Sequence, residues 1–370
     1  MNITVSVAAL VDELRLLVQV VSSKPANPLL ANILVATVDD RLRFVAANVE
    51  AGFGWVSSCP ATITEPGVIT LPAKRWLELM EKTPSDATLR IFTDRDHVRI
   101  ETGAFRARLQ TLPAMNFPAH PNVTIGDHSV VFDTPHLHGV IQQTMFAIPE
   151  KSKYLVNGAL LRIHVADGAV PDATLVATDG KRLAAATMTV AAQQTADVVI
   201  PAPTLAALDK LFQTQSTVTF SESDQHLFFT ADDRLLFSIR VEAKFPKYEQ
   251  IIPHESPYHA TLDRRHLSAA LERVGLLADA NATLRLTFEP DGVTLAADSV
   301  LAGEATERIP AVAYDGPSVT LALNWRYLLE MLTVASAQTV EIALKDADTP
   351  VLVRDGDQYQ YLNVIMLMRV

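Results

Sequence analysis

The chain has 370 residues, more than one hydrophobic core usually serves, so two or three domains are expected. Hydrophobic residues make up 49% and charged residues 20%, which excludes an intrinsically disordered chain. The formal net charge of -11 argues against a protein whose affinity for nucleic acid comes from neutralising phosphates. A DNA-binding function must therefore explain how an acidic chain stays on a polyanion.

The N-terminal stretch MNITVSVAALVDELRLLVQVV lacks a basic start, and Asp12, Glu13 and Arg15 interrupt its apolar residues. We therefore expect neither a signal peptide nor a membrane span there. Cys59 is the only cysteine, so no disulfide can form within the chain. This fits a reducing compartment and predicts a cytoplasmic protein without a membrane partner.

Three segments of the chain share one pattern, a short alternating strand that runs into an amphipathic helix. They are ITVSVAALVDELRLLVQVV, SVVFDTPHLHGVIQQTMFAI and YHATLDRRHLSAALERVGLLA. Their equivalent leucines are Leu10, Leu137 and Leu267, which are 127 and 130 residues apart. Apolar residues recur at helical spacing around each of these leucines.

A second marker follows later in each copy, where a strand runs into another helix. The segments are ITLPAKRWLELMEKT, VVIPAPTLAALDKLF and VTLALNWRYLLEMLT, in which Pro72, Pro201 and Asn324 occupy matching places. Strands with alternating apolar residues come after each helix. The sequence therefore predicts an α+β protein with three repeated domains, 1–125, 126–255 and 256–370, each with two helices and about eight antiparallel strands.

Repeated sheets of this kind leave strand edges at both ends of the chain. Unpaired edges invite aggregation unless another chain covers them. Two copies paired head to tail would cover both edges and close into a dimeric ring, which is the assembly that we expect.

The sequence contains no recognisable catalytic or metal-binding constellation. GKR at 180–182 lacks the glycine and the Ser/Thr of a phosphate-binding loop, and the histidines at 136 and 138 are badly spaced for a shared metal on a helix. The aspartate pairs at 39–40 and 232–233 fall at expected hairpin turns. No catalytic residue, metal or cofactor is predicted, and a binding protein is favoured.

Three segments carry more specificity than core packing requires: ATDGKRLA at 177–184, FPKYEQIIP at 245–253 and the terminal MLMRV at 366–370. A hairpin, a linker between domains and a buried last strand are the plain structural explanations for them. An apolar, methionine-rich chain end is nevertheless unusual, because chain ends are commonly polar and methionine suits adaptable binding surfaces.

Together with YLVNG at 154–158, TLPAMNFP at 111–118 and KPANPLLANILV at 24–35, these segments resemble the bacterial DNA polymerase III beta subunit family, the sliding clamps. The resemblance covers the whole chain. It implies a processivity factor that encircles double-stranded DNA without sequence preference. It also implies partners that insert short peptides into an apolar pocket, namely the polymerase III catalytic subunit, the clamp loader and other clamp-binding proteins.

The resemblance further assigns residues to that pocket between the second and third domains. They would be Val156, Thr178, Gly180, Lys181, Arg182, Leu183, Pro246, Ile251, Asn324, Tyr327, Val364, Met366, Met368 and Arg369. Such a groove would combine desolvated apolar contacts with a polar rim. Leu155, Lys181 and Leu367 depart from the family's usual residues, which affects peptide preference.

The same resemblance implies contacts between two copies and with DNA. For the dimer, Leu276 and Leu277 would meet Ala107 and Leu109, with Glu304 and Glu307 against Lys74 or Arg75. The candidate DNA contacts are Lys24, Lys74, Lys151, Lys153, Tyr154, Lys210, Arg264 and Arg265. Phosphate contacts of this kind would be blind to sequence.

A closed ring would reconcile the acidic charge with DNA, because topology replaces strong static affinity. Two other interpretations stay open at this point. One is a repeat-built enzyme with a site at Asp179 and Arg182, although no histidine in that motif could act as a base near neutral pH. The other is a structural interaction protein that never meets DNA.

Overall fold

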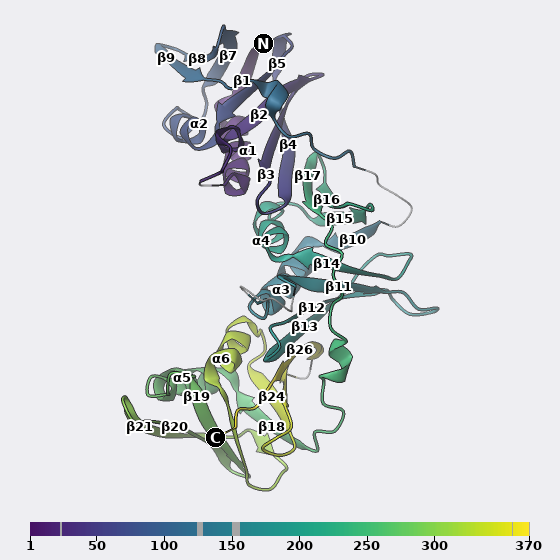
Figure 1. Cartoon of the computed structure of the whole chain (residues 1–370), viewed down its shortest axis with the longest axis vertical. Coiled ribbons are helices and arrows are strands. Elements are labelled where there is room, and N and C mark those ends of the chain that lie inside the picture. The colour runs from purple at the N-terminus through teal and green to yellow at the C-terminus, as the bar shows by residue number, and fades with distance from the viewer. Residues whose placement is uncertain (23, 124–128, 150–155, 357, 370) are drawn as a thin grey trace. The chain divides into compact units, whose positions relative to one another are not determined.

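A computed structural model describes residues 1–22, 24–123, 129–149, 156–356 and 358–369 (Figure 1). The chain forms two compact units. The first consists of Met1–Thr134 and Ala206–Val241, and the second of Pro135–Leu205 and Glu242–Val370.

The first unit contains a five-stranded and an eight-stranded antiparallel sheet. The five-stranded sheet has the order β5 (Thr62–Glu65), β1 (Asn2–Ser6), β7 (Thr88–Asp94), β8 (His97–Thr102) and β9 (Phe105–Gln110). The eight-stranded sheet has the order β10 (Val130–Asp133), β15 (Thr217–Glu222), β16 (His226–Ala231), β17 (Arg234–Ile239), β4 (Phe53–Pro60), β3 (Arg41–Asn48), β2 (Asn32–Val38) and β6 (Val68–Pro72). Its β4–β17 pairing joins the first and second repeats.

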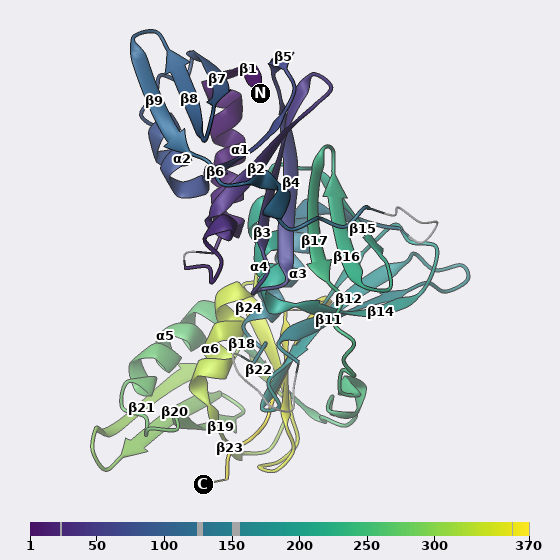
Figure 2. The same cartoon turned by 45° about the horizontal axis from the view of Figure 1, so that its top comes forward.

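Helices α1 (Val7–Val20) and α2 (Ala73–Met80) lie side by side in this unit (Figure 2). Leu10, Leu14 and Leu17 recur at helical spacing on α1, and each is 0% exposed. This confirms the amphipathic helix expected from the first repeat marker. Pro72 stands directly before α2, where the second marker places it.

The second unit contains a nine-stranded and a four-stranded sheet, also antiparallel. The nine-stranded sheet has the order β14 (Ala196–Pro201), β11 (Gly158–His164), β12 (Asp172–Thr178), β13 (Arg182–Thr189), β26 (Gln358–Ile365), β25 (Val351–Asp355), β24 (Thr339–Leu344), β18 (Tyr258–Asp263) and β22 (Ala313–Tyr314). The four-stranded sheet has the order β21 (Gly303–Pro310), β20 (Gly292–Ser299), β19 (Thr283–Glu289) and β23 (Val319–Asn324). Its β13–β26 pairing joins the second and third repeats.

The remaining helices are α3 (Thr134–Met145), α4 (Ala202–Leu211), α5 (Arg264–Gly275) and α6 (Trp325–Val334). Two of them begin at a side-chain cap. Asp263 accepts a hydrogen bond from the His266 amide at 2.9 Å, and Asn324 accepts one from the Arg326 amide at 3.0 Å. Both contacts satisfy amides that lack partners inside a helix.

The described residues therefore contain six α-helices, two for each predicted repeat, and nine, eight and nine strands in chain order. This confirms the α+β class and the predicted element content. The two compact units divide the chain differently, since β10 and β15–β17 group with the first unit and β11–β14 with the second. The exact domain boundaries stay a prediction.

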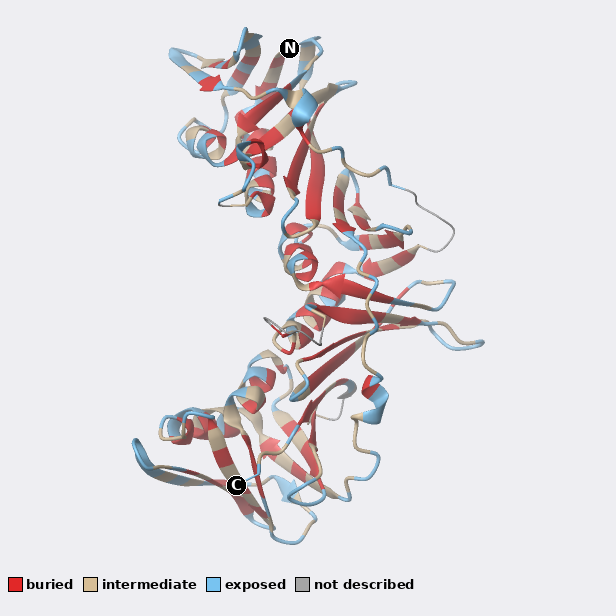
Figure 3. Ribbon diagram, viewed as in Figure 1, coloured by how far each residue is buried: buried red, intermediate tan, exposed pale blue. Residues whose placement is uncertain are grey.

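Buried residues concentrate on the strands and on one side of the helices (Figure 3). Cys59 belongs to this core, being 3% exposed, and burial followed by the negative charge of Glu13 raises its pKa to about 12. Such a thiol is protonated at neutral pH and unsuited to nucleophilic chemistry. Among the described residues, no helix combines the length and the apolar character that crossing a membrane requires.

Candidate partner-binding site

The β12–β13 hairpin of the second unit presents the central residue of the predicted site, Arg182. Thr178 ends β12, and its hydroxyl donates to the Arg182 carbonyl at 2.7 Å. The Asp179 carboxylate accepts from the backbone amides of Lys181 and Arg182 at 2.9 and 3.0 Å. Gly180 adopts a φ of 83°, a conformation that glycine tolerates without strain. Asp179 and Gly180 thus stabilise the turn that positions Arg182.

The Arg182 side chain is only 10% exposed and reaches four other residues. Its Nε donates to Asp179 Oδ2 at 3.0 Å, and its Nη atoms donate to Glu330 and to the Phe146 carbonyl. The guanidinium also lies 4.4 Å from the centre of the Tyr327 ring and 5.1 Å from that of Phe146. Charge-assisted hydrogen bonds and cation–π contacts thus fix it between α3 and α6.

Helix α6 supplies two of these partners because of its spacing. Tyr327 and Glu330 are three residues apart, so they share one face of the helix. Asn324 caps the same helix and donates through Nδ2 to the Asn281 carbonyl at 3.2 Å. The cap therefore fixes where α6 begins and so where Tyr327 lies on the helix.

A hydrophobic cluster lies beside the arginine, on the paired strands β13 and β26. Leu183 and Val364 are both 0% exposed and face each other in this pairing. Val156 and Ile251 pack against the cluster as partly buried side chains. The buried members are Leu160, Val176, Leu183, Ala185, Val199, Tyr248, Ala343, Leu352 and Val364. The partly buried members can accept further apolar side chains.

The C-terminal segment after β26 is held by backbone hydrogen bonds. The Met366 amide donates to the Lys181 carbonyl at 2.9 Å, and the Met368 amide donates to the Ala322 carbonyl at 2.8 Å. Thr283 Oγ1 lies 3.8 Å from the Met368 sulfur. Met366 is 41% exposed. The methionine-rich end is thus anchored to the β12–β13 turn and to β23, while the Met366 side chain stays accessible.

Most of the predicted pocket residues therefore gather around Arg182, the cluster and the anchored tail. Pro246 lies in the chain between Phe245, which packs against the cluster, and Tyr248, which belongs to it. Arg369 is exposed. Sequence reasoning missed Phe146 and Glu330. Phe146 follows the second amphipathic helix, and nothing in the sequence marks Glu330, an exposed residue of α6.

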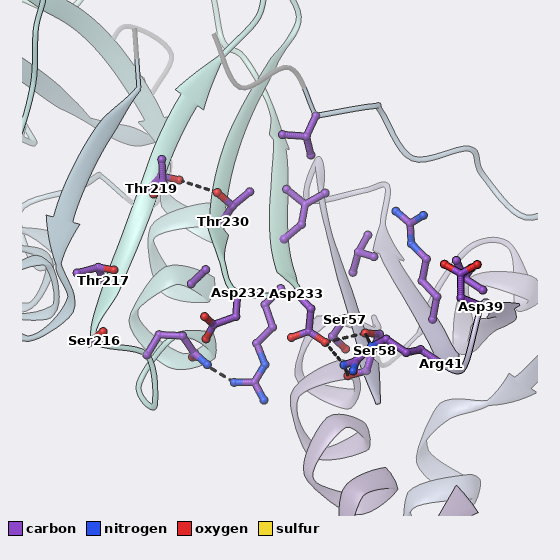
Figure 4. A pocket seen from close by; sticks show the side chains of 18 residues that line it. Asp39, Arg41, Ser57, Ser58, Ser216, Thr217, Thr219, Thr230, Asp232 and Asp233 are labelled. Carbon is purple, nitrogen blue, oxygen red and sulfur yellow. Dashed lines mark hydrogen bonds and ion pairs between the residues drawn. The ribbon is translucent and has the colours of Figure 1, made fainter. Parts of the chain in front are cut away.

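None of these residues lines the cavity of the first unit. One cavity of about 510 Å³ lies in the first unit and is lined by β3, β4 and β15–β17 (Figure 4). At its edge, Asp233 accepts hydrogen bonds from Arg41 at 2.5 Å and from Ser58 at 2.6 Å. Burial would raise the pKa of Asp233, but its hydrogen bonds and the positive charge of Arg41 together outweigh burial and lower the pKa. Asp233 thus lies in the hairpin turn expected from the sequence and also forms an ion pair with Arg41.

The predicted DNA contacts are only partly within the described residues. Lys24 follows α1 and is exposed, and Lys74 is exposed on the first turn of α2. Lys153 and Tyr154 lie outside the described residues, as does Lys151. Arg264 is used within the fold, since its guanidinium donates to the carbonyls of Ala337 and Leu332 near the end of α6.

The predicted dimer residues fall on the outer strands of two sheets and beside them. Leu109 on β9 is 8% exposed and Ala107 is half-buried, while Arg75 is exposed on α2. Leu276, after α5, is 79% exposed, and Leu277 is half-buried.

Glu304 and Glu307 both lie on β21. Glu307 already accepts a hydrogen bond from Arg273 Nε at 2.9 Å, and this hydrogen bond lowers its pKa. The contact of Glu307 with Lys74 or Arg75 of a second copy stays a prediction, in which Glu307 would share its carboxylate with Arg273.

Comparison with known proteins identifies the family. Domain profiles of the DNA polymerase III beta subunit match this chain in order: the N-terminal domain at residues 1–121, the central domain at 132–247 and the C-terminal domain at 249–369. A beta sliding clamp from Caulobacter vibrioides is 32% identical over 378 residues, covering 100% of both chains. The chain belongs to the DNA polymerase III beta subunit family.

Solved structures of the family agree. A DNA polymerase III subunit beta from Pseudomonas aeruginosa is similar with a TM-score of 0.93 at 27% identity, covering 100% of both chains. A sliding clamp of the same organism bound to griselimycin gives a TM-score of 0.92 at 27% identity, again over 100% of both chains. The three-domain clamp architecture expected from the repeats is therefore confirmed.

Membership of the beta subunit family decides between the open interpretations. The family acts in DNA replication as a sliding clamp, a non-catalytic processivity factor of DNA polymerase. The alternative of an enzyme with a site at Asp179 and Arg182 is therefore wrong, and these two residues form a structural ion pair instead. The alternative of a scaffold unrelated to DNA is set aside for the same reason.

Proposed function

We propose that two copies of this beta subunit pair head to tail into a ring around double-stranded DNA, built from clamp domains 1–125, 126–255 and 256–370. We further propose that polymerase, clamp loader and other partners are tethered through the site around Arg182. The observation that carries this second proposal is the anchored C-terminal tail beside the partly buried apolar cluster.

The site suits an apolar peptide better than a charged one. Val156, Ile251 and Met366 offer partly exposed apolar surface around a fully buried floor. The guanidinium of Arg182 is already engaged by two carboxylates, so it positions the neighbouring rings and does not capture an acidic ligand. Methionine side chains at the rim adapt to different partner sequences.

Ring closure is supported by two outer strands. Among the described strands, β9 ends the five-stranded sheet and β21 ends the four-stranded sheet. Each exposes backbone groups along one side, and strands of two copies can satisfy them by pairing. Ala107, Leu109, Leu276 and Leu277 would then contribute apolar contacts next to the paired strands.

Binding to DNA would depend on enclosure more than on charge. Lys24 and Lys74 are exposed and can reach phosphates. A net charge of -11 opposes strong static affinity, and a closed ring does not need it. We place this assembly in the cytoplasm, where a replication factor acts.

Removal of residues 368–370 tests the tethering site. Without the Met368 amide and its bond to Ala322, the tail should lose its anchor, and binding of a clamp-binding peptide should weaken at least tenfold. Fluorescence polarisation with a labelled peptide measures this loss, and primer extension on a long template should show shorter products.

Two comparisons make this deletion interpretable. Met366→Ser removes only an exposed side chain of the site and should also weaken the peptide. Val312→Ser removes an apolar side chain, 65% exposed, that belongs to none of these contacts, and should leave peptide binding unchanged. Unimpaired peptide binding in the truncated protein, with the oligomeric mass preserved, would refute the site.

A further inference from the structure

The turn between β20 and β21 exposes two large apolar side chains. Val300 is 103% exposed and Leu301 is 98% exposed. Turns of this kind are usually built from Gly, Asn, Asp, Ser and Pro. Here Ser299 Oγ accepts from the Ala302 amide at 3.3 Å and Gly303 has a φ of 99°, so the turn chemistry is supplied by the flanking residues. Val300 and Leu301 are therefore not needed to make the turn.

We propose that this tip, Val300 and Leu301, packs on residues 112–115 of a second copy of the chain. The inference rests on the proposed head-to-tail dimer, and it adds an apolar contact beyond the paired strands.

The two outer strands each have one buried face. On β9, Leu109 and Ala107 pair with Val98 and Ile100 of β8, which are 0% exposed. In a continuous sheet across two copies, this face must continue into the buried face of β21, because side chains alternate between faces.

On β21 the buried face is set by its pairing with β20. Glu307 pairs with Leu295 and Ile309 pairs with Val293, and both partners are 0% exposed. Ala305 lies two residues before Glu307 and shares this face. Odd-numbered residues of β9 therefore have to lie opposite odd-numbered residues of β21.

Three antiparallel registers meet this rule and pair at least five residues of β9, and the third of them sets Arg108 opposite Arg308. In the first, Ala107 lies opposite Ala305 and Arg108 opposite Glu304. In the second, Ala107 lies opposite Glu307 and Arg106 opposite Arg308. Opposite charges across strands stabilise a pair and like charges destabilise it. The first register is therefore favoured.

The charges around these strands support the same choice. Arg108 lies beside Arg99 on β8, and Glu304 lies beside Asp298 on β20. Each thus has a like charge as its neighbour within its own sheet. No described residue forms an ion pair with Arg108 or with Glu304, so each is available to the other across the interface.

All three registers bring the tip to the same segment, and the third sets Leu301 opposite Met115. Extending the first beyond β9 puts Val300 opposite Leu112, and extending the second puts it opposite Ala114. Met115 on the short 3-10 helix η2 (Ala114–Asn116) is 90% exposed, the apolar surface that a Val-Leu tip would cover. The tip would thus find an apolar side chain in each of the three registers.

The receiving segment is already fixed in the single chain. The Leu112 amide donates to Thr70 Oγ1 at 3.0 Å, and Thr70 Oγ1 donates to the Leu112 carbonyl at 2.9 Å. A segment held in this way loses little freedom when a partner covers it. In a head-to-tail dimer the contact occurs twice, so its loss weakens both interfaces.

The test is the dimer dissociation constant, measured by analytical ultracentrifugation of the full chain. The double variant Val300→Ser/Leu301→Ser should raise it at least 100-fold, about tenfold for each interface. Met115→Ser should raise it at least tenfold. Adding Met115→Ser to the double variant should change it less than threefold further, because the contact is already lost.

Matched variants separate this contact from general effects. Val170→Ser removes an apolar side chain, 71% exposed, in the turn between β11 and β12, and should leave the constant unchanged. Arg108→Glu and Glu304→Arg should each weaken the dimer, and their combination should restore it. Failure of the combination to restore it would overturn the register.

Two negative results have different meanings. A wild-type chain that stays monomeric at every concentration would overturn the proposed ring, and the tip contact with it. A wild-type dimer whose dissociation constant is unchanged by Val300→Ser/Leu301→Ser would overturn the tip contact alone.

Discussion

Replacing Arg182 with alanine is expected to weaken partner-peptide binding at least 100-fold and to lower the free energy of unfolding by about 3 kcal/mol. The guanidinium is 10% exposed and neutralises Asp179, whose side chain is 19% exposed. Its removal leaves the Asp179 carboxylate without its cation. It also removes the cation–π contacts that the guanidinium makes with the rings of Tyr327 and Phe146. The expected loss of unfolding free energy lies at the lower end of the range for buried ion pairs, because the Glu330 side chain is 48% exposed.

The measurements for Arg182→Ala are urea denaturation and a peptide titration. Arg182→Lys keeps the charge but not the planar fork, so it should recover only part of both losses. Lys345→Ala breaks a more exposed ion pair of the same unit, with Glu255 at 3.3 Å, and should change stability by less than about 1 kcal/mol. Wild-type peptide affinity in Arg182→Ala would contradict a positioning role for this residue.

Replacing Arg234 with methionine should be the most destabilising change in the first unit, at about 3–5 kcal/mol. Arg234 Nη2 lies 2.8 Å from Glu13 Oε1, and the two side chains are 14% and 9% exposed. The other carboxylate oxygen, Glu13 Oε2, is buried without a hydrogen-bond partner among the described atoms. Without Arg234, α1 would hold an uncompensated buried charge against β17.

A second ion pair of the same unit provides the control. Arg41 and Asp233 are 40% and 41% exposed, so Arg41→Met should cost less than about 1 kcal/mol. The double variant Glu13→Leu/Arg234→Met should recover most of the stability, because a buried ion pair can often be replaced by apolar residues without loss. If urea denaturation gave equal losses of unfolding free energy for Arg234→Met and Arg41→Met, burial would not explain the cost of removing Arg234.

Local patterns in the sequence predict the helices well. Leu10 and Leu267 are 0% exposed and Leu137 is 6% exposed, as the helical spacing of all three repeats requires. Asp263 and Asn324 begin helices because their side chains accept backbone amides, a local effect. Such features depend on residues within a few positions, and a single sequence contains that information.

The network of the candidate site depends on long-range contacts, which the sequence does not encode locally. Glu330 is 148 positions from Arg182, and Phe146 is 36 positions away. Glu13 illustrates the same limit. In the sequence it only interrupts an apolar helix, whereas its partner Arg234 lies 221 positions further along the chain. Ion pairs between residues so far apart in the sequence can be identified only from the three-dimensional arrangement of the strands and helices.

The family resemblance predicted which residues line the pocket but not the role of each of them. Arg182 is engaged by Asp179 and Glu330, so the structure makes it a positioning residue for the site. Glu307 is likewise engaged by Arg273, which leaves Glu304 as the acidic residue of β21 available to a partner. Residue type alone could not separate these two glutamates.

The most direct test of the account is retention of the loaded dimer on circular and on linear DNA. The acidic chain, with a net charge of -11, should stay on a nicked circle even when salt is raised, because enclosure and not phosphate contact holds it. Cutting the circle once should release it within minutes. Equal loss from circular and linear DNA, or a strong dependence of retention on salt, would contradict the closed ring.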